Sequence, residues 1–197
     1  MKHSQTTSKS KGFSLVELLV VIAIIAVLAG IAFPVITNQI AKAKITEGQK
    51  VATDLVFAIE QFQEKYDYLP FPSGGSPDGI VSYSTDGNDL LLVLMGQDDE
   101  ANPSNTKFFE YKAAKNGVNG IQFDDETPKA LLDPWGEPYT IVIDYTGDRE
   151  IDLSQVPELS AYQDKDGEAL TIYSRDSIVA SPGPDKEYND IEDVKSW

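Results

Sequence analysis

The sequence predicts an α+β fold in which a long N-terminal helix packs on a small C-terminal antiparallel sheet. Two observations support this prediction. A mostly apolar run without charge extends from Leu18 to Ala41, and apolar residues then recur at three- and four-residue steps as far as Tyr66, as on one face of a helix. Later, Thr140–Tyr145 is rich in β-branched and aromatic residues and follows a turn, which is typical of a strand. A helix and a sheet with one apolar face each can bury those faces against each other.

Residues 1–12 are polar and basic, with Lys2, Lys9 and Lys11 and no acid. A secretory signal has its apolar region before the cleavage site, whereas here the apolar region follows. Cleavage between Gly12 and Phe13 would therefore leave the apolar segment attached. The alternative is an uncleaved cytoplasmic flank of a signal anchor. The lysines place this end in the cytoplasm in both cases.

Residues 18–41 are predicted to form a transmembrane helix. The 24 residues carry no formal charge, and about 20 are enough to cross a bilayer. Gly30 and Pro34 lie inside this segment. Proline removes one backbone donor and crowds the carbonyl of the preceding turn, so we expect a kink or a locally melted turn from Gly30 to Pro34.

Glu17 lies at the edge of the apolar segment, where a carboxylate is unfavourable unless it is paired. No Lys or Arg follows until Lys42. Cleavage after Gly12 would create a cation, the α-amine of Phe13, close to Glu17 in the chain. This charge pair can form within one subunit or between neighbouring subunits. The alternative is an acid that simply lies at the level of the lipid headgroups.

The helix is predicted to continue beyond the membrane and to end before Leu69-Pro70-Phe71-Pro72, because proline restricts both itself and the residue before it. A helix from Ser14 to Tyr66 would be about 80 Å long at ~1.5 Å per residue. Gly48 is a weak point in it. Its second half has one apolar face, made by Val51, Leu55, Ala58, Ile59, Phe62 and Tyr66.

The middle of the chain contains few strong signals. Residues 73–89 are rich in Gly, Ser, Pro and Asp and are predicted to form a loop. Residues 90–96 are predicted to form a short buried helix ended by Gly96. Residues 107–111 are a possible strand, and Asn116-Gly117 and Asn119-Gly120 mark turns.

The C-terminal third is predicted to supply the sheet. Asp133–Tyr139 forms a rigid turn that carries an aromatic anchor, and Thr140–Tyr145 follows as a strand. Residues 169–174 and 177–180 are two further strands. We expect an antiparallel sheet of three or four strands that packs on the extramembrane part of the helix.

Composition excludes several classes of function. The net charge is −16, and without the three leader lysines 13 basic and 32 acidic residues leave −19. Such an acidic surface repels phosphate backbones, so no nucleic-acid partner is expected, whereas hard cations are favoured. Without cysteine the chain forms no disulfide or thiolate site. The single histidine, His3, lies in the leader, so the mature chain has no His-based triad or zinc site.

The Gly12-Phe13 junction, with Glu17 in front of an apolar helix, resembles the type III signal of the type IV pilin and pseudopilin superfamily. Asp133-Pro134-Trp135-Gly136-Glu137-Pro138-Tyr139, a strand and the segment Ser181–Asp185 resemble the major pseudopilin of type II secretion systems. The resemblance implies a pilin-like fold. It also implies that a prepilin peptidase cuts between Gly12 and Phe13 and methylates the amine of Phe13.

Further roles are implied by the same resemblance. Glu17 would neutralise the amine of an adjacent subunit during assembly, and the helix would melt near Pro34 in the filament. The domains would be a cleaved leader, 1–12, a transmembrane and filament-core helix, 13–41, and a periplasmic globular domain, 42–197, which includes the amphipathic half of the helix.

The C-terminal segment resembles the family's calcium loop. Calcium binds carboxylate and carbonyl oxygens, usually on a loop that folds around it. The resemblance implies a structural calcium ion held by Pro182, Asp185, Asp190 and Asp193, in a loop one residue shorter than usual. The alternative is an acidic, solvated tail.

Three functions are compatible with these features. The first is a structural subunit of the type II secretion pseudopilus, a single-pass protein of the bacterial inner membrane with its C-terminal domain in the periplasm. Its partners would be further copies of itself in a helical homopolymer, the prepilin peptidase, minor pseudopilins, the inner-membrane assembly platform and the membrane.

The second is a type IV pilin for adhesion, motility or DNA uptake, although many of those carry a C-terminal disulfide. The third is a membrane-tethered enzyme or binding module. No enzyme activity is expected, because no nucleophile motif or Gly-rich phosphate loop is recognisable.

Overall fold

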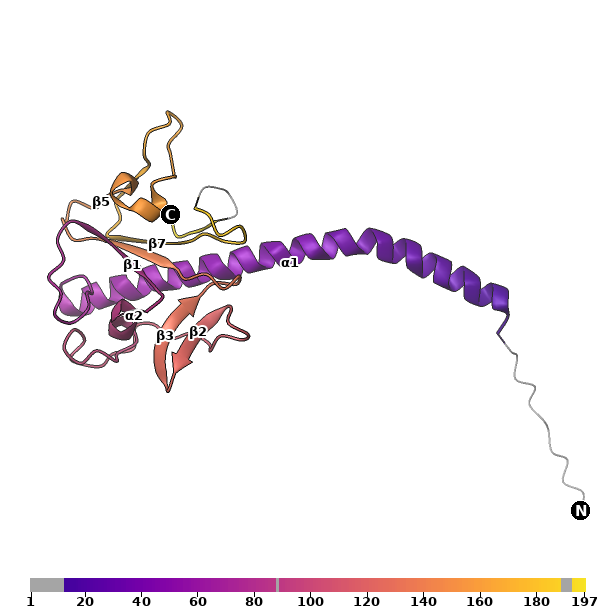
Figure 1. Cartoon of the computed structure of the whole chain (residues 1–197), viewed down its shortest axis with the longest axis horizontal. Coiled ribbons are helices and arrows are strands. Elements are labelled where there is room, and N and C mark those ends of the chain that lie inside the picture. The colour runs from indigo at the N-terminus through magenta and orange to yellow at the C-terminus, as the bar shows by residue number, and fades with distance from the viewer. Residues whose placement is uncertain (1–12, 88, 189–192) are drawn as a thin grey trace, which may run out of the picture. The chain divides into compact units, whose positions relative to one another are not determined.

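The computed structural model describes residues 13–87, 89–188 and 193–197, without the side chains of residues 32–35. The chain divides into two compact units, residues 1–42 and 43–197. The elements of the second unit build an α+β fold, in which the end of a long helix packs with a small antiparallel sheet (Figure 1). The predicted fold class is therefore confirmed.

Helix α1 extends over Leu15–Tyr66, 52 residues, and so confirms the predicted long helix and its end before Pro70. Glu17 in the first turn and Lys65 in the last turn interact favourably with the helix dipole and so stabilise the helix. The sequence predicts a kink or a locally melted turn at Gly30 to Pro34; the backbone is helical there, so the single chain has no melted turn, and the kink stays a prediction. One proline removes only one bond of the helical ladder. Melting in an assembled filament stays a prediction.

The main sheet has four antiparallel strands in the order β1-β4-β7-β8. The predicted strands at 140–145 and 177–180 are confirmed as β4 and β7. In the register Ile141 lies opposite Tyr83 on one side and Val179 on the other. The bounds are β1 Ile80–Ser84, β4 Thr140–Asp144, β7 Ser177–Ser181 and β8 Val194–Lys195.

Both faces of β4 are buried, because successive side chains of a strand point to opposite faces. Ile141 and Ile143 join the core formed with the second half of α1. Val142 belongs to a second apolar cluster beneath the short helices η1, Leu153–Gln155, and η2, Pro157–Leu159. The sheet is thus covered by α1 on one face and by this cluster on the other. This explains why the strand is a continuous apolar run.

Two small strand pairs flank the sheet. The hairpin β2–β3 pairs Gly120–Asp124 with Thr127–Leu132, and β5, Glu150–Asp152, pairs with β6, Thr171–Tyr173. The predicted strand at 169–174 therefore forms, but it pairs with β5 and lies outside the main sheet.

The predicted short buried helix is confirmed as α2, Asp89–Leu94. Gly96 follows it with a φ of 72°, a conformation that glycine adopts without strain. The predicted turns at Asn116-Gly117 and Asn119-Gly120 are confirmed by positive φ values at Asn116, Gly117 and Asn119.

Two predictions for the middle region are wrong. Residues 107–111 form no strand, because the N–H groups of Phe108 and Phe109 both donate to the carbonyl of Leu94, at 2.9 and 3.0 Å. Their aromatic side chains pack into the core instead, with the ring of Phe108 5.3 Å from that of Phe62. The predicted loop at 73–89 contains β1, which forms by pairing with β4.

Candidate assembly site

The first turn of α1 gives Glu17 a hydrogen-bond partner. The backbone N–H of Ser14 donates to Oε2 of Glu17 at 2.8 Å, and the N–H of Leu18 donates to the carbonyl of Ser14 at 3.2 Å. This is half of a capping box, in which an acid three residues into the helix satisfies the N–H of the cap residue. The carboxylate therefore accepts from a neutral donor adjacent to Phe13. Gly12 lies outside the described residues.

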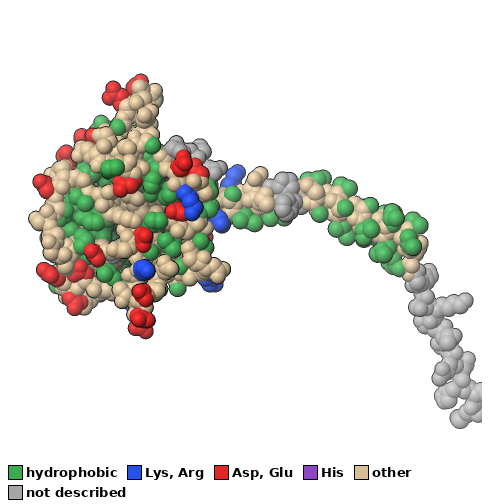
Figure 2. All heavy atoms as spheres, viewed as in Figure 1, with side chains coloured by type: hydrophobic (Ala, Val, Ile, Leu, Met, Phe, Trp, Pro, Cys, Tyr) green, Lys and Arg blue, Asp and Glu red, His purple; other side chains and the backbone are tan. Residues whose placement is uncertain are grey.

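The membrane-length part of α1 exposes apolar side chains, and Figure 2 shows them along the face in view. Leu15 is 79% exposed and Val27 is 64% exposed. Within the described residues, α1 is the one helix long and apolar enough to cross a membrane. An all-apolar helix surface is stable only when lipid or other apolar helices cover it. The large exposed residues here are Phe13, Leu15, Val16, Leu18, Leu19, Val20, Val21, Ile22, Ile24, Ile25, Val27, Leu28, Ile31, Ile36 and Ile40.

The turn before β4 is organised by Asp133, which is completely buried. Its Oδ1 accepts the N–H groups of Trp135, Gly136 and Glu137 at 2.8, 2.7 and 2.9 Å. Its Oδ2 accepts the hydroxyl of Ser181 at the end of β7. Burial raises the pKa of Asp133, and these hydrogen bonds to the carboxylate offset part of the rise. The sequence predicted a rigid turn, and the structure adds its link to the C-terminal segment.

At Gly48, helix α1 and the C-terminal strand β8 approach each other closely. A Cβ atom at Gly48 would lie 2.7 Å from Cγ2 of Val194 and 3.5 Å from Cδ of Pro134. Glycine in a helix interior costs about 1 kcal/mol relative to alanine. Here it allows β8 and the Asp133 turn to contact the helix directly. Sequence reasoning noted only a weak point, because the contact depends on residues far along the chain.

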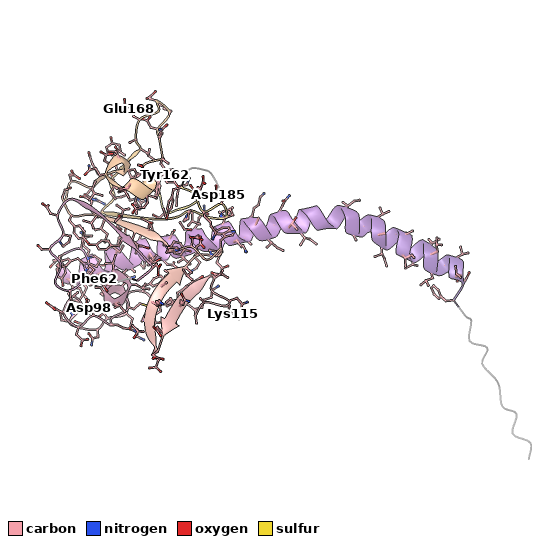
Figure 3. All side chains as sticks on the ribbon, viewed as in Figure 1. Phe62, Asp98, Lys115, Tyr162, Glu168 and Asp185 are labelled. Carbon is pink, nitrogen blue, oxygen red and sulfur yellow. The ribbon has the colours of Figure 1, made fainter. Side chains whose placement is uncertain are left out.

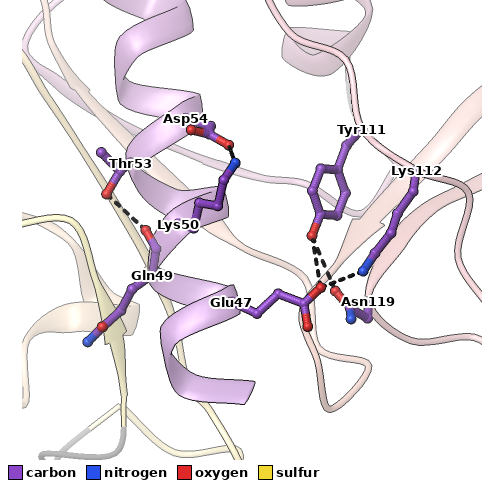
Figure 4. Close-up of polar contacts among 8 residues, drawn as sticks. All are labelled: Glu47, Gln49, Lys50, Thr53, Asp54, Tyr111, Lys112 and Asn119. Carbon is purple, nitrogen blue, oxygen red and sulfur yellow. Dashed lines mark hydrogen bonds and ion pairs between the residues drawn. The ribbon is translucent and has the colours of Figure 1, made fainter. Parts of the chain in front are cut away.

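A polar cluster connects the same part of α1 to the segment before β2 (Figure 4). Nζ of Lys112 lies 2.5 Å from Oε1 of Glu47, and the hydroxyl of Tyr111 donates to that oxygen at 3.4 Å. The hydrogen bond from Lys112 lowers the pKa of Glu47. Asn119 also lies within hydrogen-bond distance of Tyr111, at 3.5 Å. The sequence analysis did not predict this cluster, because neither Glu47 nor Lys112 belongs to a recognisable motif.

The four predicted calcium ligands differ in burial: two are buried, one is exposed, and one lies outside the described residues. Asp193 is 1% exposed, and its Oδ2 accepts the hydroxyl of Tyr162. Pro182 is buried, whereas Asp185 is exposed and accepts the N–H of Glu187 at 3.0 Å (Figure 3). Asp190 lies outside the described residues. Among the residues that the structure describes, no group of three acidic, His or Cys side chains could hold a metal ion. Oxygen donors of the type that calcium uses are present, and the site itself stays a prediction.

Comparisons with known proteins agree with the N-terminal features. Residues 7–33 match the prokaryotic N-terminal methylation motif. Fimbrial protein EcpB of Eikenella corrodens is 34% identical over 119 residues, which cover 59% of this chain and 65% of that protein. Type IV major fimbrial protein FimA of Dichelobacter nodosus is 32% identical over 92 residues, 47% of this chain and 57% of FimA. The FimA of strain VCS1703A is 42% identical over 92 residues, 47% of this chain and 56% of that protein.

The chain matches less than two thirds of the length of each of these relatives. No solved structure shows a significant match. The methylation motif and the homology to type IV fimbrial proteins support a place in the type IV pilin superfamily. The relatives are named as fimbrial proteins. The particular branch of the superfamily, pilin or pseudopilin, is not distinguished by these matches.

Proposed function

We propose that this protein is a structural subunit that polymerises through α1 into a helical filament. The observation that carries the proposal is the exposed apolar surface that Phe13 to Ile31, Ile36 and Ile40 form among the described side chains. Lipid covers this surface in the single subunit, and neighbouring helices cover it in the filament. Contacts between different faces of identical subunits produce a helical polymer when the rotation between subunits does not close into a ring.

Processing would prepare Glu17 for assembly. A prepilin peptidase would cut between Gly12 and Phe13 and methylate the new amine. In the uncut chain Glu17 accepts a neutral N–H from Ser14. After cleavage the amine of a neighbouring subunit supplies a cation in a region of low dielectric, where an unpaired carboxylate is costly. The pair then stabilises the assembled state over the separate subunits.

Within the superfamily we propose the type II secretion pseudopilus, with the globular domain in the periplasm. The supporting feature is the turn at Asp133, linked through Ser181 to the C-terminal segment. The chain also has no cysteine for a C-terminal disulfide. Minor pseudopilins and the inner-membrane assembly platform would be its partners. A structural calcium ion would be held by Pro182, Asp185, Asp190 and Asp193 and would connect the last residues to β7.

The second candidate is a type IV pilus subunit, which the homology to fimbrial proteins favours. Deletion of the gene at native expression separates the two. Loss of exported proteins from the medium, without surface fibres in the parent, supports the pseudopilus. Surface fibres that disappear on deletion, with export unchanged, support the pilus and contradict the secretion role.

A further inference from the structure

Phe57 projects from the polar outer face of α1 in the globular unit. Its side chain is 58% exposed, and Thr53 and Glu60, one turn away on either side, are also exposed. Lys50 and Asp54 form an exposed ion pair nearby, with Nζ and Oδ2 2.5 Å apart. These charges are unfavourable in lipid, so a protein surface is the suitable partner for this aromatic ring.

A groove of suitable chemistry lies at the end of the same helix. It has a volume of about 630 Å³ and is lined in part by Gln63, Tyr68, Leu69, Phe71, Tyr145 and Arg149. The rings of Tyr68 and Phe71 form one wall, with centroids 5.9 Å apart.

Arg149 also lines the groove. Its Nε lies 3.2 Å from Oδ1 of Asp176, and its second guanidinium nitrogen donates to the carbonyl of Ser174 at 3.1 Å. These contacts hold the guanidinium, and the Arg149 side chain is 57% exposed. A phenyl ring in the groove would gain aromatic contacts and a cation–π contact.

The geometry of α1 excludes docking of Phe57 in the groove of its own chain. Phe57 and Gln63 are about 9 Å apart along the helix axis and about 120° apart around it. A surface residue and a groove on different faces of one molecule pair only between copies, and they form an open filament when the rotation between the copies does not close. Phe57 lies on the same helix as the exposed apolar segment that begins at Phe13. In the proposed filament this segment packs against neighbouring copies, so a neighbouring copy is also the expected partner of Phe57.

We propose that Phe57 of one subunit inserts into the groove of a neighbouring copy and helps to set the packing of the globular domains along the filament. This inference rests on the proposed function of a homopolymer. It adds a contact outside the membrane-length segment, between specified residues of the two copies.

Cysteine pairs test the contact cleanly, because the chain has no cysteine. The full chain carrying Phe57→Cys and Phe71→Cys is expressed in cells and oxidised. We expect a ladder of disulfide-linked multimers from the double variant and no ladder from either single variant. Gln49→Cys with Phe71→Cys is the matched control, since Gln49 is exposed about 12 Å farther along α1. A disulfide from the thiol introduced at position 57 to another protein, instead of to a second copy, would overturn the proposal.

The cysteine substitutions could themselves prevent assembly, so the assembled fraction of two further variants is measured as well. Phe57→Ala should lower the assembled fraction at least about tenfold, since buried aromatic residues dominate interfaces. Phe57→Tyr, which keeps the ring, should restore it. Filaments at the wild-type level from Phe57→Ala, without a disulfide ladder from the double cysteine variant, would overturn this contact alone. A wild-type chain that forms no filaments would overturn the proposed function as well.

Discussion

Replacement of Asp133 by alanine tests the link between the turn and the C-terminal segment. The carboxylate is completely buried and accepts three backbone N–H groups and the hydroxyl of Ser181. Each buried donor left without an acceptor costs about 1–3 kcal/mol. The turn can relax toward water, because Trp135 and Glu137 are only partly buried. We therefore expect a loss of about 4 kcal/mol in the free energy of unfolding, below the full sum.

The assay is thermal unfolding of the full chain in detergent micelles, followed by tryptophan fluorescence, to which Trp135 beside the turn contributes. For a domain of this size the loss corresponds to a melting temperature about 8–16 °C lower. Asp164→Ala is the matched control. Asp164 also accepts backbone N–H groups, from Asp166 at 2.8 Å and Glu168 at 3.1 Å, but it is exposed. Equal melting temperatures for the two variants, within about 2 °C, would refute the reasoning.

The pH dependence of the same carboxylate gives a second readout. Burial raises the pKa of Asp133 in the folded chain. At a pH between the unfolded and the folded pKa, the folded state therefore keeps a proton that the unfolded state has lost. The stability that Asp133 contributes is then greatest below the unfolded pKa of ~3.9 and declines as the pH rises through the folded pKa. Asp133→Asn does not titrate. The difference in stability between wild type and Asp133→Asn should therefore shift in favour of wild type as the pH falls from 7 toward 4.

Three further substitutions or treatments can be measured in the same assay. The hydroxyl of Tyr139 is buried and has no hydrogen-bond partner among the described residues, so Tyr139→Phe should leave the stability unchanged or raise it by about 1 kcal/mol; a clear loss would contradict this. Gly48→Ala should destabilise by about 1–3 kcal/mol, because its Cβ would meet Val194 at 2.7 Å, whereas Gly30→Ala, with no described atom within 4 Å, should not. Removal of calcium by a chelator should lower the melting temperature of wild type but not of Asp185→Asn, and equal responses would argue against the metal site.

Local patterns explain which parts of the fold were predictable. Helix α1 and strands β4 and β7 are specified by apolar periodicity and by runs of β-branched residues. Strand β1 contains Ile80, Val81 and Tyr83, but it lies in a segment rich in Gly, Ser, Pro and Asp, and β8 has only two residues. Residues 107–111 have the composition of a strand, and their packing against α1 and α2 overrides it.

Some parts of the candidate site could likewise be predicted from the sequence, and others could not. The residues around Glu17 are a contiguous motif and could be found from the sequence. The contact of Asp133 with Ser181 and the approach of Gly48 to Val194 join distant parts of the chain. Such pairs become visible only when the sheet and the helix are assembled, since neither residue alone indicates its partner.

The central claim is that Glu17 controls assembly through its charge. Glu17→Gln keeps an oxygen that can accept the N–H of Ser14 as in a capping box, but it cannot neutralise an amine. The direct measurement is the fraction of processed, membrane-inserted protein that is recovered as filaments in wild type, Glu17→Gln and Glu17→Ala. We expect both variants to be inserted and to lose filaments at least about tenfold. Filaments of Glu17→Gln at the wild-type level would contradict the account.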